Sequence, residues 1–127
     1  VAETIDWAQA LVELDCVAID PERAAKESPY GATIAHGYLT LSLYPMLREI
    51  VKPEPPFPGV INVINYGLNK LRFTNAVRSG AKVRSKAVIA AVDEVKGGLQ
   101  VTETVTIEID GEERPACVAE AIMRYYF

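Results

Sequence analysis

The side chains able to do acid–base or nucleophilic chemistry are few in this sequence. Its 127 residues include one histidine, His36, and two cysteines, Cys16 and Cys117. A mechanism that needs an imidazole from this subunit must therefore use His36. One histidine and two cysteines cannot complete a zinc-type ligand set, so we expect no metal site. Cys117 stands in an apolar stretch, which is typical of a buried free thiol.

Acidic residues before His36 are candidates for a general base. Glu13 and Asp15 could take this role, although a carboxylate in a short polar stretch is more often simply solvated. Asp20 is followed by Pro21 and Glu22, an order typical of a helix N-cap with proline at the first helical position. We therefore expect Asp20 to cap a short helix rather than to act in catalysis.

Six basic residues form a run in the second half of the chain. No acid occurs from Lys70 to Val92, although the net charge of the chain is −4. Such a run would attract phosphate groups or an acidic partner protein. A solvated strand face is the equal alternative, and the overall acidity argues against a nucleic-acid binder. The six residues are Lys70, Arg72, Arg78, Lys82, Arg84 and Lys86.

Composition and length favour one globular domain spanning residues 1–127. Half of the residues are apolar and 24% are charged, which suits a core that needs no disulfide. No apolar stretch reaches the roughly 18 residues of a membrane span, so we expect no membrane association. The free cysteines and the lack of an export signal favour the cytoplasm.

The first half of the chain has a helical pattern. After a short helix from Asp20 to about Glu27, apolar residues recur at spacings of three and four from His36 to Val51. This pattern predicts a helix that is apolar almost all round and therefore buried, with a kink at Pro45. The proline-rich segment 52–59 predicts an internal loop.

The second half has a strand pattern. Val60 to Thr74 and Lys82 to Val95 are long β-type runs, and Gly67 is expected at a bulge. Apolar and polar residues alternate strictly from Leu99 to Ile109, which places Val101, Val105, Ile107 and Ile109 on one face. Asp110-Gly111 predicts a two-residue hairpin before a last strand from Pro115 to Phe127.

These elements predict an α+β domain in which a curved antiparallel sheet wraps around the apolar helix. The strands can be antiparallel neighbours or a meander. Such a sheet has open edges, and we expect a homodimer to pair them.

A helix wrapped in a sheet is the hot-dog arrangement, and several ordered blocks resemble one hot-dog family. The block Ile34-Ala-His-Gly-Tyr-Leu-Thr-Leu-Ser42 resembles the signature helix start of MaoC-like acyl dehydratases, the (R)-specific enoyl-CoA hydratase family. The block from Ile64 to Phe73 resembles the matching strand of its nodulation-protein-N-like branch. Val77 to Val83 and Gly111 to Glu120 resemble its turn and its last hairpin. The resemblance covers roughly Asp20 to Phe127.

The resemblance implies an enzyme that interconverts 2-enoyl and (R)-3-hydroxyacyl thioesters. Coenzyme A or an acyl carrier protein would carry the acyl group, and no other cofactor is expected. In the family a backbone N–H at the helix start polarises the thioester carbonyl, and the matching residue is Gly37. Ser42 could contact the thioester or only its own backbone.

Other substrate contacts are expected on the strands. Tyr66 and Asn69 could line the acyl site, although packing is an equal explanation for a tyrosine beside a glycine. Arg72 and Arg84 belong to the basic run and could meet the phosphates of coenzyme A.

The sequence differs from the family at the acid–base pair, which in the family is an aspartate and a histidine. The histidine position falls on Ala18 and the aspartate position on Glu13, with Asp15 the nearest aspartate. Either the protein has lost the pair, or residues are missing from this stretch of the sequence. His36 is a surrogate acid–base group or thioester contact, or it holds the loop by a hydrogen bond.

Two functions follow from this gap. The first is a hydratase/dehydratase that uses Gly37, Asp15 and His36. The second is a non-catalytic hot-dog subunit that binds acyl thioesters or stabilises a partner.

Overall fold

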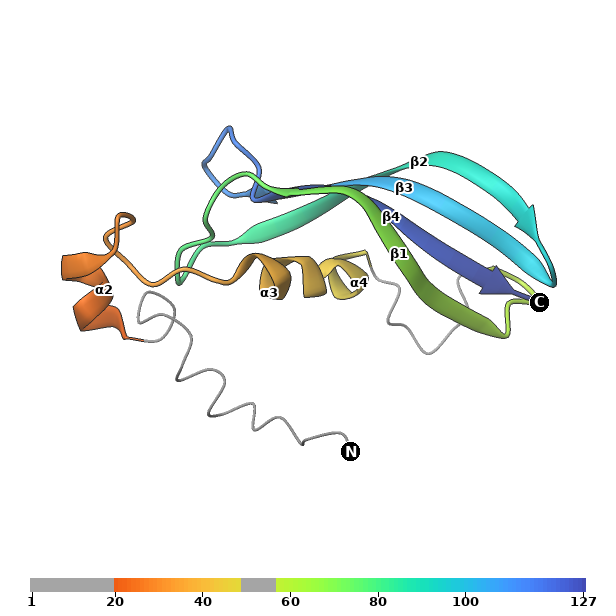
Figure 1. The fold of residues 1–127 in the computed structure, drawn as a ribbon, viewed down its shortest axis with the longest axis horizontal. Coiled ribbons are helices and arrows are strands. Elements are labelled where there is room, and N and C mark those ends of the chain that lie inside the picture. The colour runs from red at the N-terminus through yellow and green to blue at the C-terminus, as the bar shows by residue number, and fades with distance from the viewer. Residues whose placement is uncertain (1–19, 49–56) are drawn as a thin grey trace, which may run out of the picture.

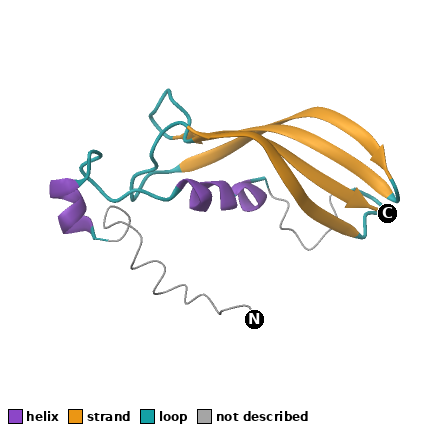
Figure 2. Ribbon diagram, viewed as in Figure 1, coloured by secondary structure: helices purple, strands orange, loops and turns teal. Residues whose placement is uncertain are grey.

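The computed structural model describes residues 20–48 and 57–127. This part of the chain holds helices α2 (Pro21–Glu27), α3 (Gly37–Ser42) and α4 (Tyr44–Leu47), followed by strands β1 (Asn62–Phe73), β2 (Val83–Val95), β3 (Gly98–Ile109) and β4 (Cys117–Tyr126). The strands form one curved sheet, α3 and α4 lie against its concave side, and α2 stands apart from it (Figures 1 and 2). The expected α+β arrangement of a sheet around a helix is confirmed.

Helix α2 begins and ends where its sequence predicts. The Asp20 carboxylate accepts a hydrogen bond of 3.0 Å from the N–H of Arg23, so Asp20 is the N-cap. Pro21 has no N–H to leave unpaired in the first turn. The N–H of Ser28 closes the last turn on the carbonyl of Ala24 at 3.0 Å. The prediction that Asp20 caps a helix is confirmed.

The expected long helix from His36 onward is divided in two. It breaks at Leu43, which ends α3 and caps α4. Pro45 lies in the first turn of α4, where a missing N–H breaks no helical hydrogen bond. Instead of the kink expected at Pro45, the chain leaves one helix and begins the next at Leu43, two residues earlier. Residues 49–51 of the expected helix lie outside the described residues.

Burial of this helix on all sides was a wrong prediction. Tyr38, Leu39 and Met46 are exposed by 75%, 57% and 60%, whereas Thr40 and Tyr44 are buried. The sheet covers only one side of α3 and α4, so the remaining apolar side chains face outward.

The sheet has the order β1-β4-β3-β2, and all neighbours are antiparallel. It is not a meander, because β1 pairs with the last strand. Strands β1 and β2 are consecutive in the chain but form opposite edges. The basic run from Lys70 to Lys86 is consequently divided between the two edges.

Strand β1 contains two bulges. Its register with β4 shifts between Asn65 and Gly67, as predicted, and again between Asn69 and Arg72. Lys70 in the second bulge has a φ of 50°, a left-handed conformation that is rare for a lysine. Each bulge adds one residue and so shifts the inward–outward alternation by one position. Leu68 and Phe73 consequently both pair with buried positions of β4, Ala121 and Cys117.

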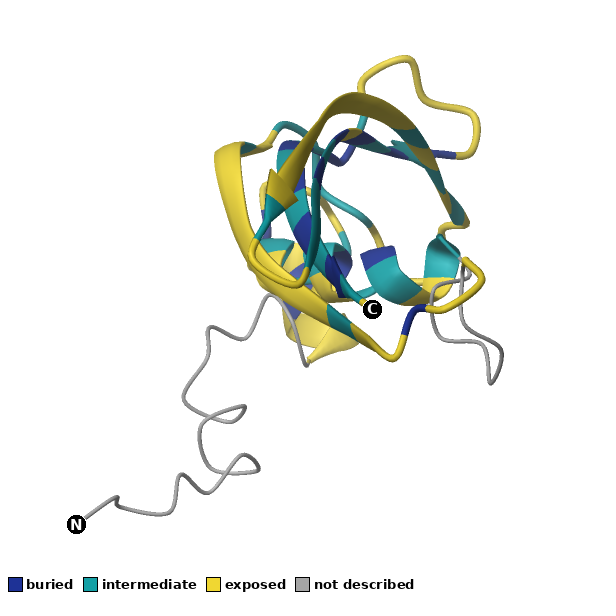
Figure 3. Ribbon diagram, turned by 90° about the vertical axis from the view of Figure 1, so that its right-hand side faces the viewer, coloured by how far each residue is buried: buried dark blue, intermediate teal, exposed yellow. Residues whose placement is uncertain are grey.

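The core lies on the concave face of β3 and β4. Burial alternates along both strands, and Figure 3 shows this alternation as changes of colour along the ribbon. The predicted inward set is confirmed: Val101, Val105, Ile107 and Ile109 are all buried. Cys117 is a fully buried free thiol, and this burial raises its pKa.

The connection between β3 and β4 is longer than the predicted two-residue hairpin. The last register pair is Ile107 with Cys117. A turn closes where the N–H of Glu112 meets the carbonyl of Ile109 at 3.1 Å. Pro115 has no N–H for a strand ladder, so pairing resumes only at Ala116, whose N–H donates to the carbonyl of Ile107 at 2.8 Å.

Candidate active site

The start of α3 is packed closely against β1. A Cβ added to Gly37 would lie 2.6–2.8 Å from three atoms of the Phe73 ring, so only glycine fits under this ring. The first N–H groups of a helix have no partner within the helix. Among residues 20–48 and 57–127, no acceptor is found for the N–H of Gly37. This donor is therefore available to a ligand.

A cavity of about 370 Å³ opens beside Gly37. We call it the Gly37 cavity, and its size lies within the range of small-molecule sites. Of the described residues in its lining, only Arg114 is charged. The lining consists of Tyr30, Ile34, Ala35, Gly37, Thr40, Phe73, Thr74, Asn75, Ala76, Arg114 and Ala116.

A second cavity, also of about 370 Å³, lies farther along the same helices. We call it the Tyr44 cavity. It is bounded by the helices on one side and by β1 and β4 on the other, and most of its lining is apolar. The lining consists of Leu41, Ser42, Tyr44, Pro45, Asn65, Gly67, Leu68, Ala121, Ile122 and Met123. A polar group at Gly37 and an apolar chain along the helices would fit this arrangement.

Ser42 lines the Tyr44 cavity, but its hydroxyl is engaged locally. The Ser42 Oγ donates a hydrogen bond of 2.6 Å to the carbonyl of Leu39 in the preceding turn. Of the two predicted roles, the structure shows the contact with its own backbone. The Ser42 oxygen keeps only its acceptor capacity for a ligand.

A buried carboxylate, which the sequence analysis did not single out, lies behind the Tyr44 cavity. Glu103 on β3 is 2% exposed. Its Oε2 accepts a hydrogen bond from the Tyr44 hydroxyl, and its Oε1 lies 2.5 Å from Arg48 Nη2. Glu103 occupies an inward position between Val101 and Val105, so the alternation that predicted the core also held the signal for this residue.

Glu103 is poorly placed to act as a base. Burial, followed by the hydrogen bond to Glu103, raises the pKa of Tyr44 above its usual value. The hydrogen bond to Glu103 also raises the pKa of Arg48. Tyr44 therefore stays protonated and Arg48 stays charged, and together they occupy both carboxylate oxygens. The cluster of Tyr44, Arg48 and Glu103 ties α4 to the sheet rather than offering a free acid–base pair.

His36 is the N-cap of α3, but its side chain makes no capping hydrogen bond. Its Nε2 is buried, and no described residue provides a hydrogen-bond partner for it. The predicted role of holding the loop by a hydrogen bond is therefore not seen at this nitrogen. The imidazole directly precedes Gly37 and has one nitrogen without a protein partner. Asp15, the other predicted acid–base residue, lies outside the described residues.

The predicted contacts on β1 are directed to the outer face of the sheet. Tyr66 stacks on the guanidinium of Arg124, which lies 3.4 Å from the ring centroid. Asn69 pairs in register with Glu120, and Arg72 pairs with Val118, both on the outward-facing set of β4. The structure therefore brings Gly37, His36 and Ser42 together along the helix, and it does not bring Tyr66, Asn69 and Arg72 to them.

Arg84 lies on β2, at the other edge of the sheet, and is paired with Glu108 at 2.5 Å. Lys86 binds the same carboxylate at 2.7 Å, and these two partners lower the pKa of Glu108. Lys70 pairs with Glu120 at 2.8 Å, and Arg78 lies 3.6 Å from Glu112. Much of the basic run is thus neutralised by acids that are distant in sequence.

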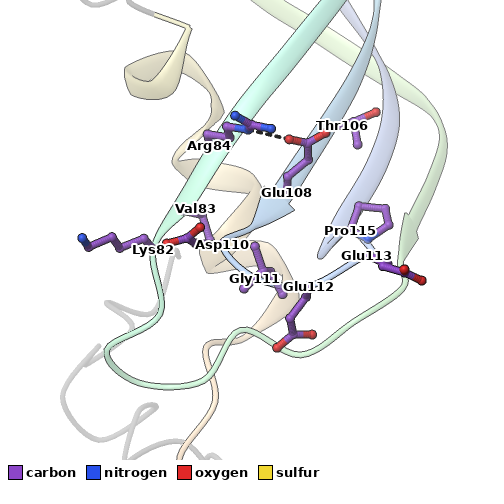
Figure 4. Close-up of a pocket in the computed structure, with 11 residues that line it drawn as sticks. Lys82, Val83, Arg84, Thr106, Glu108, Asp110, Gly111, Glu112, Glu113 and Pro115 are labelled. Atoms are coloured by element: carbon purple, nitrogen blue, oxygen red, sulfur yellow. Dashed lines mark hydrogen bonds and ion pairs between the residues drawn. The ribbon is translucent and has the colours of Figure 1, made fainter.

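A hollow of about 730 Å³ lies beside Arg84 at the β3–β4 connection. Figure 4 shows Arg84 turned toward Glu108, with the acidic side chains of the connection around the opening. Four acids face only two basic residues here, so a phosphate is not favoured. These residues are Glu108, Asp110, Glu112, Glu113, Lys82 and Arg84.

The described residues form neither a metal-binding cluster nor a membrane-spanning helix. Residues 20–48 and 57–127 contain no group of three or more histidine, cysteine, aspartate or glutamate side chains placed to hold a metal ion. Within the same ranges, no helix has the length and apolar character needed to cross a membrane.

Comparison with known proteins agrees with the fold of the sheet and the helices. Residues 10–111 match the protein family described as the MaoC like domain. The chain is 42% identical over 120 residues to 3-hydroxyacyl-thioester dehydratase Z of Mycobacterium tuberculosis, covering 94% of this chain and 77% of that protein. It is 40% identical over 122 residues to nodulation protein N of Rhizobium leguminosarum, with 94% and 74% covered.

Among solved structures, the (R)-hydratase from A. caviae involved in PHA biosynthesis superposes with a TM-score of 0.68. The sequence identity is 27%, and the match covers 91% of this chain and 80% of that chain. The hot-dog fold is thereby confirmed.

Proposed function

This chain belongs to the MaoC-like dehydratase family, and on this premise we propose that it is an acyl-thioester hydratase/dehydratase. Its reaction would interconvert 2-enoyl and (R)-3-hydroxyacyl thioesters. The observation that carries the proposal is the N–H of Gly37, which has no acceptor among the described residues and borders a cavity next to a second, apolar one. The names of the dehydratase and hydratase relatives support it.

In this proposal the thioester carbonyl accepts a hydrogen bond from the Gly37 N–H. Negative charge develops on this oxygen when water adds to the β-carbon, and an oriented backbone donor stabilises that charge. A base takes one proton from the attacking water, and an acid delivers one proton to the α-carbon. We assign these two roles to Asp15 and His36, whose imidazole directly precedes Gly37.

The acyl chain would extend from the Gly37 cavity into the Tyr44 cavity. In a helix each residue rises about 1.5 Å, so Leu41 lies about 6 Å along the axis from Gly37. The apolar lining there would remove the chain from water, at about 0.8 kcal/mol for each methylene buried. The Ser42 hydroxyl stays bonded to the carbonyl of Leu39 and makes no hydrogen bond to the acyl chain. We further propose that the chain is one domain and forms a homodimer through an open sheet edge.

A specific observation also favours the second function, a non-catalytic subunit that binds acyl thioesters. Within the described residues, His36 is the only imidazole, and both oxygens of Glu103 are engaged by Tyr44 and Arg48. In this case Gly37 and the two cavities would still hold the thioester, and no proton transfer would follow.

Two measurements on the purified chain separate these functions. Hydration of crotonyl-CoA is followed by the loss of enoyl-thioester absorbance, and chiral analysis of the product checks for the (R) isomer. Binding of butyryl-CoA, which cannot be hydrated, is measured by calorimetry. Turnover to the (R) product supports the enzyme, whereas saturable binding without turnover supports the binding subunit. The absence of both would reject the two functions together.

A further inference from the structure

We propose that Arg114 binds the phosphate of the phosphopantetheine arm that carries the acyl thioester. The inference rests on the proposed function and adds a residue that the sequence analysis did not consider. The phosphate contact thus lies in the loop before β4, and not on the basic run of β1 and β2 where it was expected.

Among the described residues, Arg114 is the only charged side chain that lines the Gly37 cavity. Unlike the cavity beside Arg84, this cavity has no carboxylate among the described residues of its lining. Among the described residues, no hydrogen bond, ion pair or ring contact engages the Arg114 guanidinium. An unpaired cation therefore stands at the cavity where the proposed function places the thioester.

The backbone that carries Arg114 is fixed to the end of β1. Asn75 Nδ2 donates a hydrogen bond of 3.2 Å to the carbonyl of Arg114. Thr74 Oγ1 lies 2.5 Å from the carbonyl of Pro115, and the Thr74 N–H donates to the carbonyl of Ala116 at 2.9 Å. Phe73, which covers Gly37, directly precedes these two anchors. The position of Arg114 is thus tied to the position of the proposed oxyanion donor.

The other basic candidates are less suited to this task. Arg84 and Lys86 share the carboxylate of Glu108, and Arg78 lies beside Glu112. Arg72 donates to its own neighbouring carbonyl, that of Leu71, at 2.7 Å. An arginine already paired with a carboxylate would have to give up this partner to bind a phosphate, whereas Arg114 would not.

The chemistry of the carrier fits an arginine at the rim of the cavity. A long pantetheine arm separates the thioester from its phosphate, so a thioester at Gly37 places the phosphate toward solvent. Arg114 is exposed, as a residue at the mouth must be. The planar guanidinium donates two parallel hydrogen bonds to phosphate oxygens. Coenzyme A and acyl carrier proteins both present this phosphate, so the inference names their shared group.

Calorimetric binding of three unreactive ligands tests the inference: butyryl-pantetheine, butyryl-4′-phosphopantetheine and butyryl-CoA. For Arg114→Ala we expect about tenfold weaker binding of the two phosphorylated ligands and unchanged binding of butyryl-pantetheine. Arg114→Lys should recover part of the loss, because the charge remains without the fork geometry. Lys96→Ala is the control, since it removes one positive charge at the exposed turn between β2 and β3.

The outcomes are distinct. Equal weakening of all three ligands, or no weakening of any, would overturn the phosphate contact while leaving the proposed function standing. Weakening of butyryl-CoA alone would assign the contact to the nucleotide phosphates and overturn the assignment to the pantetheine phosphate. If the wild-type chain binds none of the three ligands, the proposed function itself fails.

Discussion

The guanidinium of Arg48 and the carboxylate of Glu103 meet at 2.5 Å across the concave face of the sheet. Glu103 pairs in register with Ala121 on one side and with Ile89 on the other, so its neighbours in the sheet offer no polar side chain. A buried carboxylate is costly unless it is paired and hydrogen-bonded. Arg48, together with Tyr44, meets this requirement and fixes α4 to β3.

Removal of this carboxylate should destabilise the fold. Glu103→Ala leaves Tyr44 and Arg48 without their acceptor, and we expect a loss of about 2 kcal/mol in the free energy of unfolding. This is below the ~3–5 kcal/mol of fully buried pairs, because Arg48 is partly exposed. Urea unfolding measures the loss. Glu108→Ala, on the outer face of the same strand, is the control and should change the midpoint little; equal effects would contradict the interpretation.

Stability should fall at alkaline pH. Burial raises the pKa of Tyr44, Tyr125 and Cys117 in the folded protein, so the folded state retains these protons longer than the unfolded chain. Their contribution is complete below the unfolded pKa of the thiol, 9.0, and is lost as the pH rises through the higher folded values. Each group changes the free energy by up to about 1.4 kcal/mol per pH unit.

Urea midpoints between pH 7 and pH 11 measure this dependence. Tyr44→Phe removes one of the three groups and should give a shallower decline above pH 10 than the wild type. Parallel declines would show that the Tyr44 hydroxyl does not contribute.

A methyl group at Gly37 should disturb the Phe73 contact. In Gly37→Ala the new Cβ would overlap the ring, and overpacking of this kind costs about 1–3 kcal/mol. We also expect weaker binding of butyryl-CoA, since the ring or the helix start must move. Phe73→Leu in the same chain provides space and should recover much of the stability. A double variant as unstable as Gly37→Ala would show that another contact is responsible.

Ser42 should tolerate the loss of its hydroxyl. The hydroxyl donates only to the carbonyl of Leu39, so Ser42→Ala should change the free energy of unfolding by less than about 0.5 kcal/mol. Binding of butyryl-CoA should also stay within about twofold of wild type. Calorimetry and urea unfolding measure the two effects. A tenfold loss of affinity would assign Ser42 a direct thioester contact.

The secondary structure was largely predictable because its signals are local. Asp20 and Pro21 define the start of α2 through capping and a fixed φ, and the alternation of Val101, Val105 and Ile107 defines the inward face of β3. The order of the strands is not a local property. The pairing of β1 with β4 depends on contacts between residues far apart in the sequence. Neither the strand order nor the division of the basic run between the two sheet edges could therefore be predicted from local signals.

The candidate site was predictable only where a motif marked it. Gly37 followed from a resemblance, and its close contact with Phe73 supplies the physical reason for a glycine. Arg114 stands in the sequence as an ordinary charged residue of a loop, because nothing near it in the chain shows that Asn75 anchors it beside Gly37. The partners that neutralise Arg84 and Lys70 are likewise remote, at Glu108 and Glu120.

The two bulges of β1 have a consequence for changes in chain length. Because Asn65 pairs with Met123 and Gly67 with Ile122, deletion of Tyr66 would leave a continuous ladder. Deletion of Lys70 would do the same at the second bulge, since Asn69 pairs with Glu120 and Arg72 with Val118. In either case Leu68 and Phe73 would still face the helix. The edge strand can thus lose a residue at two places, whereas one deletion within β3 would turn half of its core side chains toward water.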